Sequence, residues 1–196
     1  MGEPIKNTGY DMSEAIAAFH QGVSGGLPFL GPNLDDTSVV VLATSLLDEL
    51  LKFVLLGGFH APSTSNTLVD TVFKGDGPLS RFSDRIKICT ALGIIRDDIQ
   101  HDLSVLRGIR NDFAHSHQPL RLSGFTSVKS LKTTSNLTIE DGDEHRRIFK
   151  ACCAGLVPQI AALTLMHIAR GRFINKNQAA ILEEFEIMMA EAENAE

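Results

Sequence analysis

The sequence contains no tryptophan and only one tyrosine, Tyr10. Proteins that bind single-stranded nucleic acid commonly stack bases on aromatic rings, so this chain would have to use phenylalanine or histidine for that purpose. It has three cysteines, an odd number without metal-site spacing: Cys89, Cys152 and Cys153. Because adjacent cysteines rarely bridge each other and their surroundings are apolar, we expect three buried thiols in a reducing compartment.

An excess of positive charge is also missing. The net charge is -6, and the six glutamates that follow Lys176 account for all of it, because no lysine or arginine comes after that residue. The rest of the chain is neutral overall and lacks the field of a non-specific DNA-binding protein. Residues 177–196 are therefore predicted to form an acidic C-terminal helix and tail with a solvated face.

No apolar run is long enough, without charges, to suggest a membrane span. The most apolar stretch, residues 37–56, contains Asp48, Glu49 and Lys52, which a spanning helix tolerates badly. The N-terminus has no basic region followed by an apolar core, so it predicts no secretory signal. Lys6 stands where a myristoylation signal has serine or threonine. We expect a cytoplasmic protein.

What is present is helical periodicity. The longest pattern runs from Asp35 to Gly58 and is apolar nearly all round, so it is predicted to be the central helix of a bundle. Further helices are expected at about 11–20, 63–73, 79–92, 98–115, 144–170 and 177–189. Together they predict a single all-α domain over residues 1–196, with a helical core at 35–176. Residues 116–143 are mostly polar and predict an irregular loop or hairpin.

One arginine interrupts the apolar stripe of the helix expected at 98–115, which Asp97 or Asp98 is predicted to cap. On a helical wheel with Ile99 at zero, its apolar residues lie within about 80° on either side; they are Leu103, Leu106, Ile109 and Phe113. Arg110 falls at about 20°, inside the stripe, and His115 at about 160°, outside it. Because the stripe faces the core, we expect Arg110 to point inward and His115 outward.

Two interpretations of Arg110 follow. An unpaired buried charge is costly, so the side chain is either a packing anchor bonded to Asp48, Glu49 or Asp84, or a rigid anion-binding group beside a cleft. In both cases we expect Arg110→Ala to lower the free energy of unfolding by about 3 kcal/mol. His115→Ala is expected to cost much less.

A resemblance to a known family rests mainly on residues 77–116, which read GPLSRFSDRIKICTALGIIRDDIQHDLSVLRGIRNDFAHS. Two further segments contribute, LLDELLKFVLL at 46–56 and HRRIFKACCAGL at 145–156. Over roughly residues 35–165 the sequence resembles the mannitol operon repressor family. That family is all-helical and is similar to the wider HEPN group, so the resemblance implies a single-domain HEPN-like helical bundle.

In the HEPN group, an arginine, a polar residue and a histidine with the spacing R-x4–6-H mark the ribonuclease members. The matching residues here are Arg110, Asn111 and His115, and His117 stands where some nuclease members have tyrosine. On this resemblance, Arg110 would hold a scissile phosphate. His115 would act as general acid or base, and Asn111 would orient the phosphate or the histidine.

The spacing of this motif bears on oligomeric state. Arg110 and His115 of one straight helix point about 140° apart. They can meet at one phosphate only if the helix ends before His115 or if two subunits contribute. We therefore expect a homodimer with the motif helix at or near its interface.

Several basic residues predict a rim for an anion or nucleic acid: Arg107, His117, Arg146 and Arg147. Arg121, Lys129, Lys132 and His145 either extend this rim or form a plain solvated face. Asp97, Asp98, His101 and Asp102 resemble metal ligands in composition, but solvated helix residues are the favoured interpretation. The sequence has no zinc-site spacing, P-loop or dinucleotide fingerprint, so we expect neither a metal nor a cofactor.

Two functions remain open. The resemblance implies a regulator that represses gene expression through a protein partner or an indirect nucleic-acid contact. Direct reading of a DNA operator is not expected, because no helix-turn-helix with a basic recognition helix is present. The alternative is a metal-independent endoribonuclease that uses the arginine–histidine motif on single-stranded RNA.

Overall fold

The computed structural model of the chain describes residues 27–31, 33–58, 66–135, 139 and 141–170. Every regular element in these residues is helical, which confirms the predicted all-α class. The elements are η1 (Pro28–Leu30), α2 (Asp36–Gly58), α3 (Asn66–Phe73), α4 (Phe82–Ala91), α5 (Asp97–His115), η2 (Leu122–Gly124), η3 (Thr126–Ser130) and α6 (Glu144–Arg170). The helices predicted at 11–20 and 177–189 lie outside the described residues.

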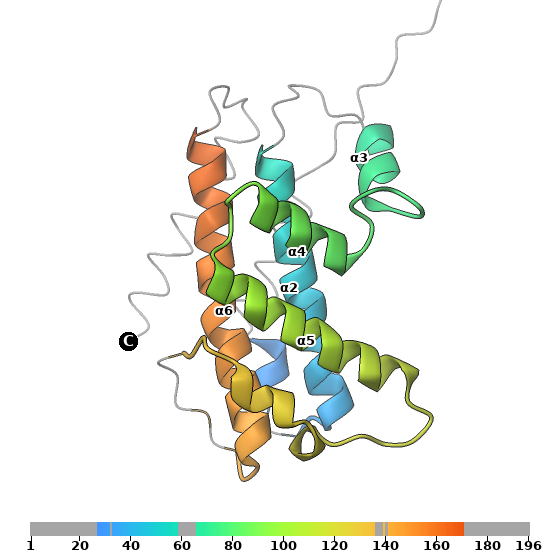
Figure 1. Cartoon of the computed structure of the whole chain (residues 1–196), viewed down its shortest axis with the longest axis vertical. Helices are drawn as coiled ribbons and strands as arrows, with labels where there is room; N and C mark the ends of the chain where they lie inside the picture. The colour runs from blue at the N-terminus through green and yellow to red at the C-terminus, as the bar shows by residue number, and fades with distance from the viewer. Residues whose placement is uncertain (1–26, 32, 59–65, 136–138, 140, 171–196) are drawn as a thin grey trace, which may run out of the picture.

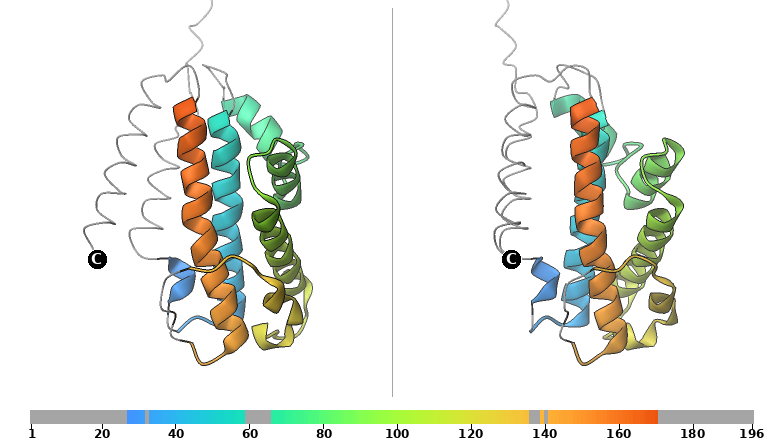
Figure 2. Two further views of the ribbon diagram at one scale, coloured as in Figure 1. Left: turned by 60° about the vertical axis from the view of Figure 1, so that its left-hand side comes forward. Right: turned by 90° about the vertical axis from the view of Figure 1, so that its left-hand side faces the viewer.

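The long helices α2 and α6 lie side by side and form the centre of the fold (Figure 1). The helices α4 and α5 cross them on one face and, with η2 and η3, form a second layer (Figure 2). Contacts of α2 with α6, α4, α5 and η1 confirm that it is the central helix. No helix in the part of the chain that the structure describes is long and apolar enough to cross a membrane.

The start of α2 is fixed by an aspartate. The Ser38 amide donates to Asp35 Oδ1 at 2.6 Å, which satisfies one of the free N–H groups of the first turn. From Val39 to Leu55, the apolar side chains on its inner face are buried, Val40 and Ala43 among them. Its apolar surface is not covered all round, because Val41 and Leu42 are exposed.

The starts of α4 and α5 both differ from the prediction. Predicted from about residue 79, α4 begins at Phe82. The α5 helix begins at Asp97, but its N-cap residue is Arg96, whose side chain makes no capping bond. The predicted aspartate cap is therefore wrong: the Asp98 carboxylate instead pairs with Arg96 at 2.9 Å. Between the helices, Gly93 adopts a φ of 66°, which glycine allows without strain.

The polar connection after α5 forms an extended loop with two short 3-10 helices and, in its described residues, no hairpin. Two carboxylates of the helical core bind its backbone. Asp36 Oδ2 accepts the Leu122 amide at 2.7 Å, and Asp102 accepts the amides of Lys132 at 2.9 Å and Thr133 at 2.7 Å. These bonds use N–H groups that a strand pairing would have needed, so the loop follows the helices instead.

The three cysteines are free and buried, as predicted. Burial raises the pKa of Cys89 to about 12. Burial also raises the pKa values of Cys152 and Cys153 well above the usual range of a thiol. The thiols are therefore protonated and unreactive at neutral pH, and they act as small apolar core residues.

Candidate functional site

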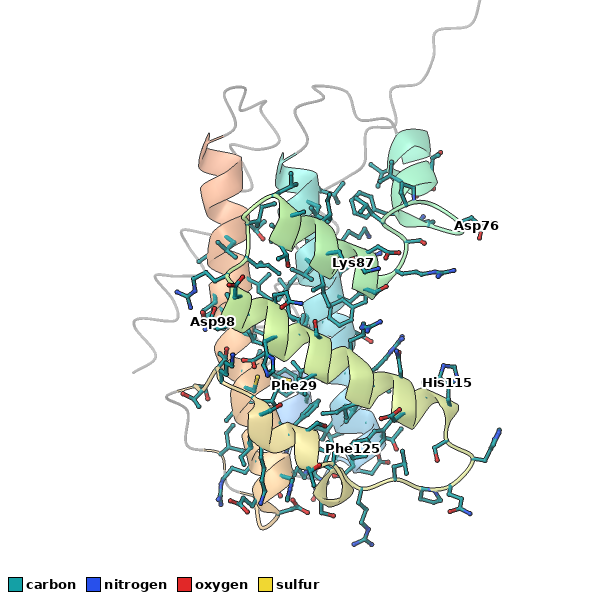
Figure 3. The ribbon with its side chains drawn as sticks, viewed as in Figure 1. Phe29, Asp76, Lys87, Asp98, His115 and Phe125 are labelled. Carbon is teal, nitrogen blue, oxygen red and sulfur yellow. The ribbon has the colours of Figure 1, made fainter. Side chains whose placement is uncertain are left out.

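The candidate site lies at the C-terminal end of α5. This helix starts over α6, crosses α2, and its last turns extend beyond the central pair, so that His115 lies at the outer edge of the molecule (Figure 3). It remains helical through His115, and the Ser116 amide closes it by donating to the Asp112 carbonyl at 3.0 Å. An early end of the helix therefore cannot bring Arg110 and His115 of one chain to the same phosphate.

Arg110 is exposed, so the prediction that it points into the core is wrong. The buried face of α5 comprises Ile99, Asp102, Leu103, Leu106, Ile109 and Phe113. In the last turns only Ile109 and Phe113 are buried, while Ala114 is exposed beside Arg110. Because α5 crosses the central helices at an angle, its buried face shifts along its length, and Arg110 falls on the uncovered side.

The other motif and rim residues on α5 and directly after it have mixed exposure. His115 and His117 are exposed, and Arg107 and Asn111 are half-buried. Arg110 and His115 are five positions apart on the helix, which corresponds to about 140° around the axis. The structure therefore brings these side chains to one end of one helix but to different sides of it. This arrangement offers an exposed guanidinium and, separately, an exposed imidazole.

The buried arginine of the fold is Arg85 of α4, which sequence reasoning missed. The residue is 6% exposed. Its Nη1 pairs with Asp48 Oδ1 at 2.6 Å, and its other donors bind the carbonyls of Leu79, Ser80 and Phe73. Burial raises the pKa of Asp48, while the charges of Arg85 and, more weakly, Arg110 oppose that rise. Arg85 thus takes the packing role that the sequence assigned to Arg110.

Asp102 is completely buried, which overturns its interpretation as a solvated helix residue. Its carboxylate binds the loop amides described above, and Cys152 Sγ lies 3.7 Å from Oδ2. The neighbouring His101 contacts the Ser130 carbonyl through Nε2 at 3.1 Å. The helical wheel indicates the burial of Asp102, because this residue falls at about 60° from Ile99, on the core side. In the described part of the chain, no group of three or more His, Cys, Asp or Glu side chains is placed to hold a metal ion.

Arg146 belongs to a charged cluster at the start of α6. Its guanidinium pairs with Asp36 at 3.0 Å and Asp141 at 2.8 Å, and it also donates to the Leu34 carbonyl. Lys150, which is 2% exposed, donates to Asp141 at 3.1 Å. These contacts give Arg146 a structural role, which joins the starts of α2 and α6, and occupy a guanidinium that an anion-binding rim would need. The adjacent rim residue Arg147 is exposed.

We expect Asp141→Asn to weaken the acid sensitivity of folding. Burial opposes ionisation of Asp141, but the Lys150 hydrogen bond, the Asp143 amide and the Arg146 charge together lower its pKa below 3.8. A carboxyl with a lowered folded pKa stabilises above its unfolded pKa, and that contribution is lost as pH falls through the folded value. The urea midpoint should therefore fall less between neutral and acid pH in the variant. Asp76→Asn, at an exposed turn, should keep the wild-type profile, and equal profiles for all three proteins would contradict the assignment.

No family model and no curated protein matches the sequence. Among solved structures, the fold is similar to that of a chain in the X-ray structure of the MtlR–HPr complex from Escherichia coli. The similarity has a TM-score of 0.45 and 19% sequence identity, and it covers 78% of this chain and 97% of that chain. So distant a likeness assigns no activity and no partner to this protein.

Proposed function

We propose that the protein is a cytoplasmic regulatory binding module, which represses gene expression through contact with another protein. The observation that carries this proposal is the unbroken course of α5 through His115. A ribonuclease of the motif's kind needs Arg110 and His115 at one phosphate, and in a single helix they diverge by about 140°. One copy of the chain therefore offers Arg110 for binding an anion, while His115 lies on a different side of the same helix.

The state of Arg110 is consistent with binding. Its side chain is exposed, and it makes no hydrogen bond or ion pair with any residue that the structure describes. A guanidinium with free, planar donors suits carboxylate and phosphate groups. A regulatory partner that supplies a carboxylate would complete these bonds.

The endoribonuclease remains the second candidate because both motif side chains are accessible. It requires two copies, paired about a two-fold axis so that Arg110 of one faces His115 of the other. Asn111, half-buried between them on α5, would then orient the phosphate or the imidazole. This candidate therefore predicts a dimer in light scattering, with α5 at its interface.

An RNA-cleavage assay separates the two functions. We expect purified protein in EDTA to leave single-stranded RNA intact, and His115→Ala to behave in the same way. Cleavage of RNA but not of DNA, with 2′,3′-cyclic phosphate ends, would favour the nuclease if His115→Ala abolished it. Equal trace cleavage by wild type and variant would indicate contamination.

A second experiment tests the regulatory role directly. Deleting the gene for this chain should change the abundance of a defined set of transcripts. The wild-type gene should restore them, and Arg110→Glu should not, because it reverses the exposed charge. Unchanged transcripts in the deletion strain would contradict the proposal, whatever the outcome of the RNA assay.

A further inference from the structure

We propose that residues 107–132, here called the basic segment, form the docking surface of the protein and that its partner is an acidic protein segment with apolar side chains between its carboxylates. This inference rests on the proposed regulatory function and names the surface and the partner chemistry. The basic segment comprises the end of α5, the following loop, η2 and η3, which belong to one layer of the fold (Figure 2).

The basic segment differs in charge from the rest of the chain. It contains five cationic side chains, those of Arg107, Arg110, Arg121, Lys129 and Lys132, and a single acid, Asp112. All five cations are exposed except Arg107, which is half-buried. The neutral overall balance of residues 1–176 thus conceals a local excess of positive charge, which attracts an anionic surface.

The five cations also differ from the others in their ion pairing. None of them forms an ion pair with a residue that the structure describes. Elsewhere in the described chain, most cations have a carboxylate: Lys52, Lys74, Arg85, Lys87, Arg96, Arg146 and Lys150. Outside the basic segment, Arg81 and Arg147 are the described exceptions. A cation without an internal partner needs no rearrangement before it binds an external carboxylate.

The backbone that presents these cations is held in place. Asp36 binds the Leu122 amide, and Asp102 binds the amides of Lys132 and Thr133. Within the segment, the rings of Phe113 and Phe125 stack with centroids 5.3 Å apart. These contacts attach the loop to α2 and α5 at separate points, so its cations project from an ordered backbone and lose less entropy on binding.

The apolar residues of the basic segment favour a protein partner over a nucleic acid. Leu120, Phe125 and Leu131 lie among the cations in sequence; they pack against the core but keep part of their surface exposed. Leu120 and Leu131 offer no surface on which a base could stack, and the Phe125 ring already stacks on Phe113. A peptide that alternates acidic and apolar residues matches both kinds of side chain, whereas a phosphate backbone matches only the charge.

Fluorescence anisotropy with two probes tests this inference. The first probe is a labelled peptide in which glutamates alternate with leucine and glycine, and the second is labelled poly(U) RNA. We expect the peptide to bind more tightly than the RNA and to bind less tightly as salt is raised. Arg121→Glu combined with Lys129→Glu should weaken peptide binding by about tenfold or more, which corresponds to about 1.4 kcal/mol.

A matched control carries the same change of charge elsewhere. Lys74→Glu combined with Arg96→Glu alters two exposed cations outside the basic segment and should bind the peptide nearly as the wild type does. Equal weakening in both double variants, or no peptide binding by the wild type, would overturn the inference. Preference for RNA, lost in the basic-segment variant, would overturn the partner chemistry. If gene deletion changes transcripts but the wild-type protein does not bind the peptide, the proposed regulatory function is supported and the proposed docking surface is wrong.

Discussion

Arg85→Ala is expected to lower the free energy of unfolding by about 3 kcal/mol, because it removes a buried cation and leaves the half-buried Asp48 carboxylate without its partner. Asp48 would lose its 2.6 Å ion pair, and four backbone carbonyls would lose a donor. Removal of the Arg85 charge should also raise the pKa of Asp48 further, since that charge now opposes the effect of burial. The loss of stability should therefore become smaller as pH falls and Asp48 takes up a proton.

Urea unfolding monitored by circular dichroism measures this effect, with two variants as references. Arg110→Ala, on the exposed side of α5, should change the free energy of unfolding by less than about 0.5 kcal/mol. Asp48→Asn in the Arg85→Ala background should recover part of the lost stability, because it removes the stranded charge. If Arg110→Ala proved as damaging as Arg85→Ala, the assignment of the buried arginine would be wrong.

Asp102→Ala is expected to lower the free energy of unfolding by about 3 kcal/mol, since two amides lose a buried acceptor and each such loss costs about 1 to 3 kcal/mol. The estimate lies below the sum of two full penalties because the loop can move and expose its amides to water. Hydrogen exchange at the Lys132 and Thr133 amides should accelerate more than exchange in α2. Asp102→Asn, which keeps the side-chain size and one acceptor oxygen, should lie between the alanine variant and the wild type.

The same variants connect stability to binding. If Asp102 holds the basic segment in place, Asp102→Asn should weaken binding of the acidic peptide while the helical content stays unchanged. Asp97→Asn, at the exposed start of α5, removes an equal charge and should leave both hydrogen exchange and binding as in the wild type. Unchanged exchange at Thr133 in Asp102→Ala would show that the carboxylate does not fix the loop.

The long helices α2, α5 and α6 were predictable because each has a long periodic pattern. Asp35 and Gly58 delimit α2 in the sequence as they do in the structure. The start of α4 was not predictable, because the chain before it is held by hydrogen bonds to residues outside its own turn. The Leu79 amide donates to the Val72 carbonyl, and the Leu79 carbonyl accepts from Arg85 Nε. Local propensity contains no information about such contacts.

The candidate site was predictable only in part. The wheel assigned Ile99, Leu103 and Phe113 to the core correctly, but it assumes that a partner covers one fixed stripe along the whole helix. Because α5 crosses the central pair and extends beyond it, Arg110 escapes burial. The buried acceptor role of Asp102 depends on loop amides 30 and 31 residues away, which no spacing rule within the helix predicts.

The side-by-side arrangement of α2 and α6 has a consequence for synthesis of the chain. Asp36 and Arg146, which join the two helices, are 110 residues apart. At elongation rates of about 5 to 20 residues per second, α2 leaves the ribosome on the order of 5 to 20 s before its main partner. During that interval the residues of α2 that end in the core, Leu47, Leu51 and Val54 among them, have no α6 to cover them. The nascent chain is therefore most exposed to aggregation, and most in need of a chaperone, between the emergence of α2 and that of α6.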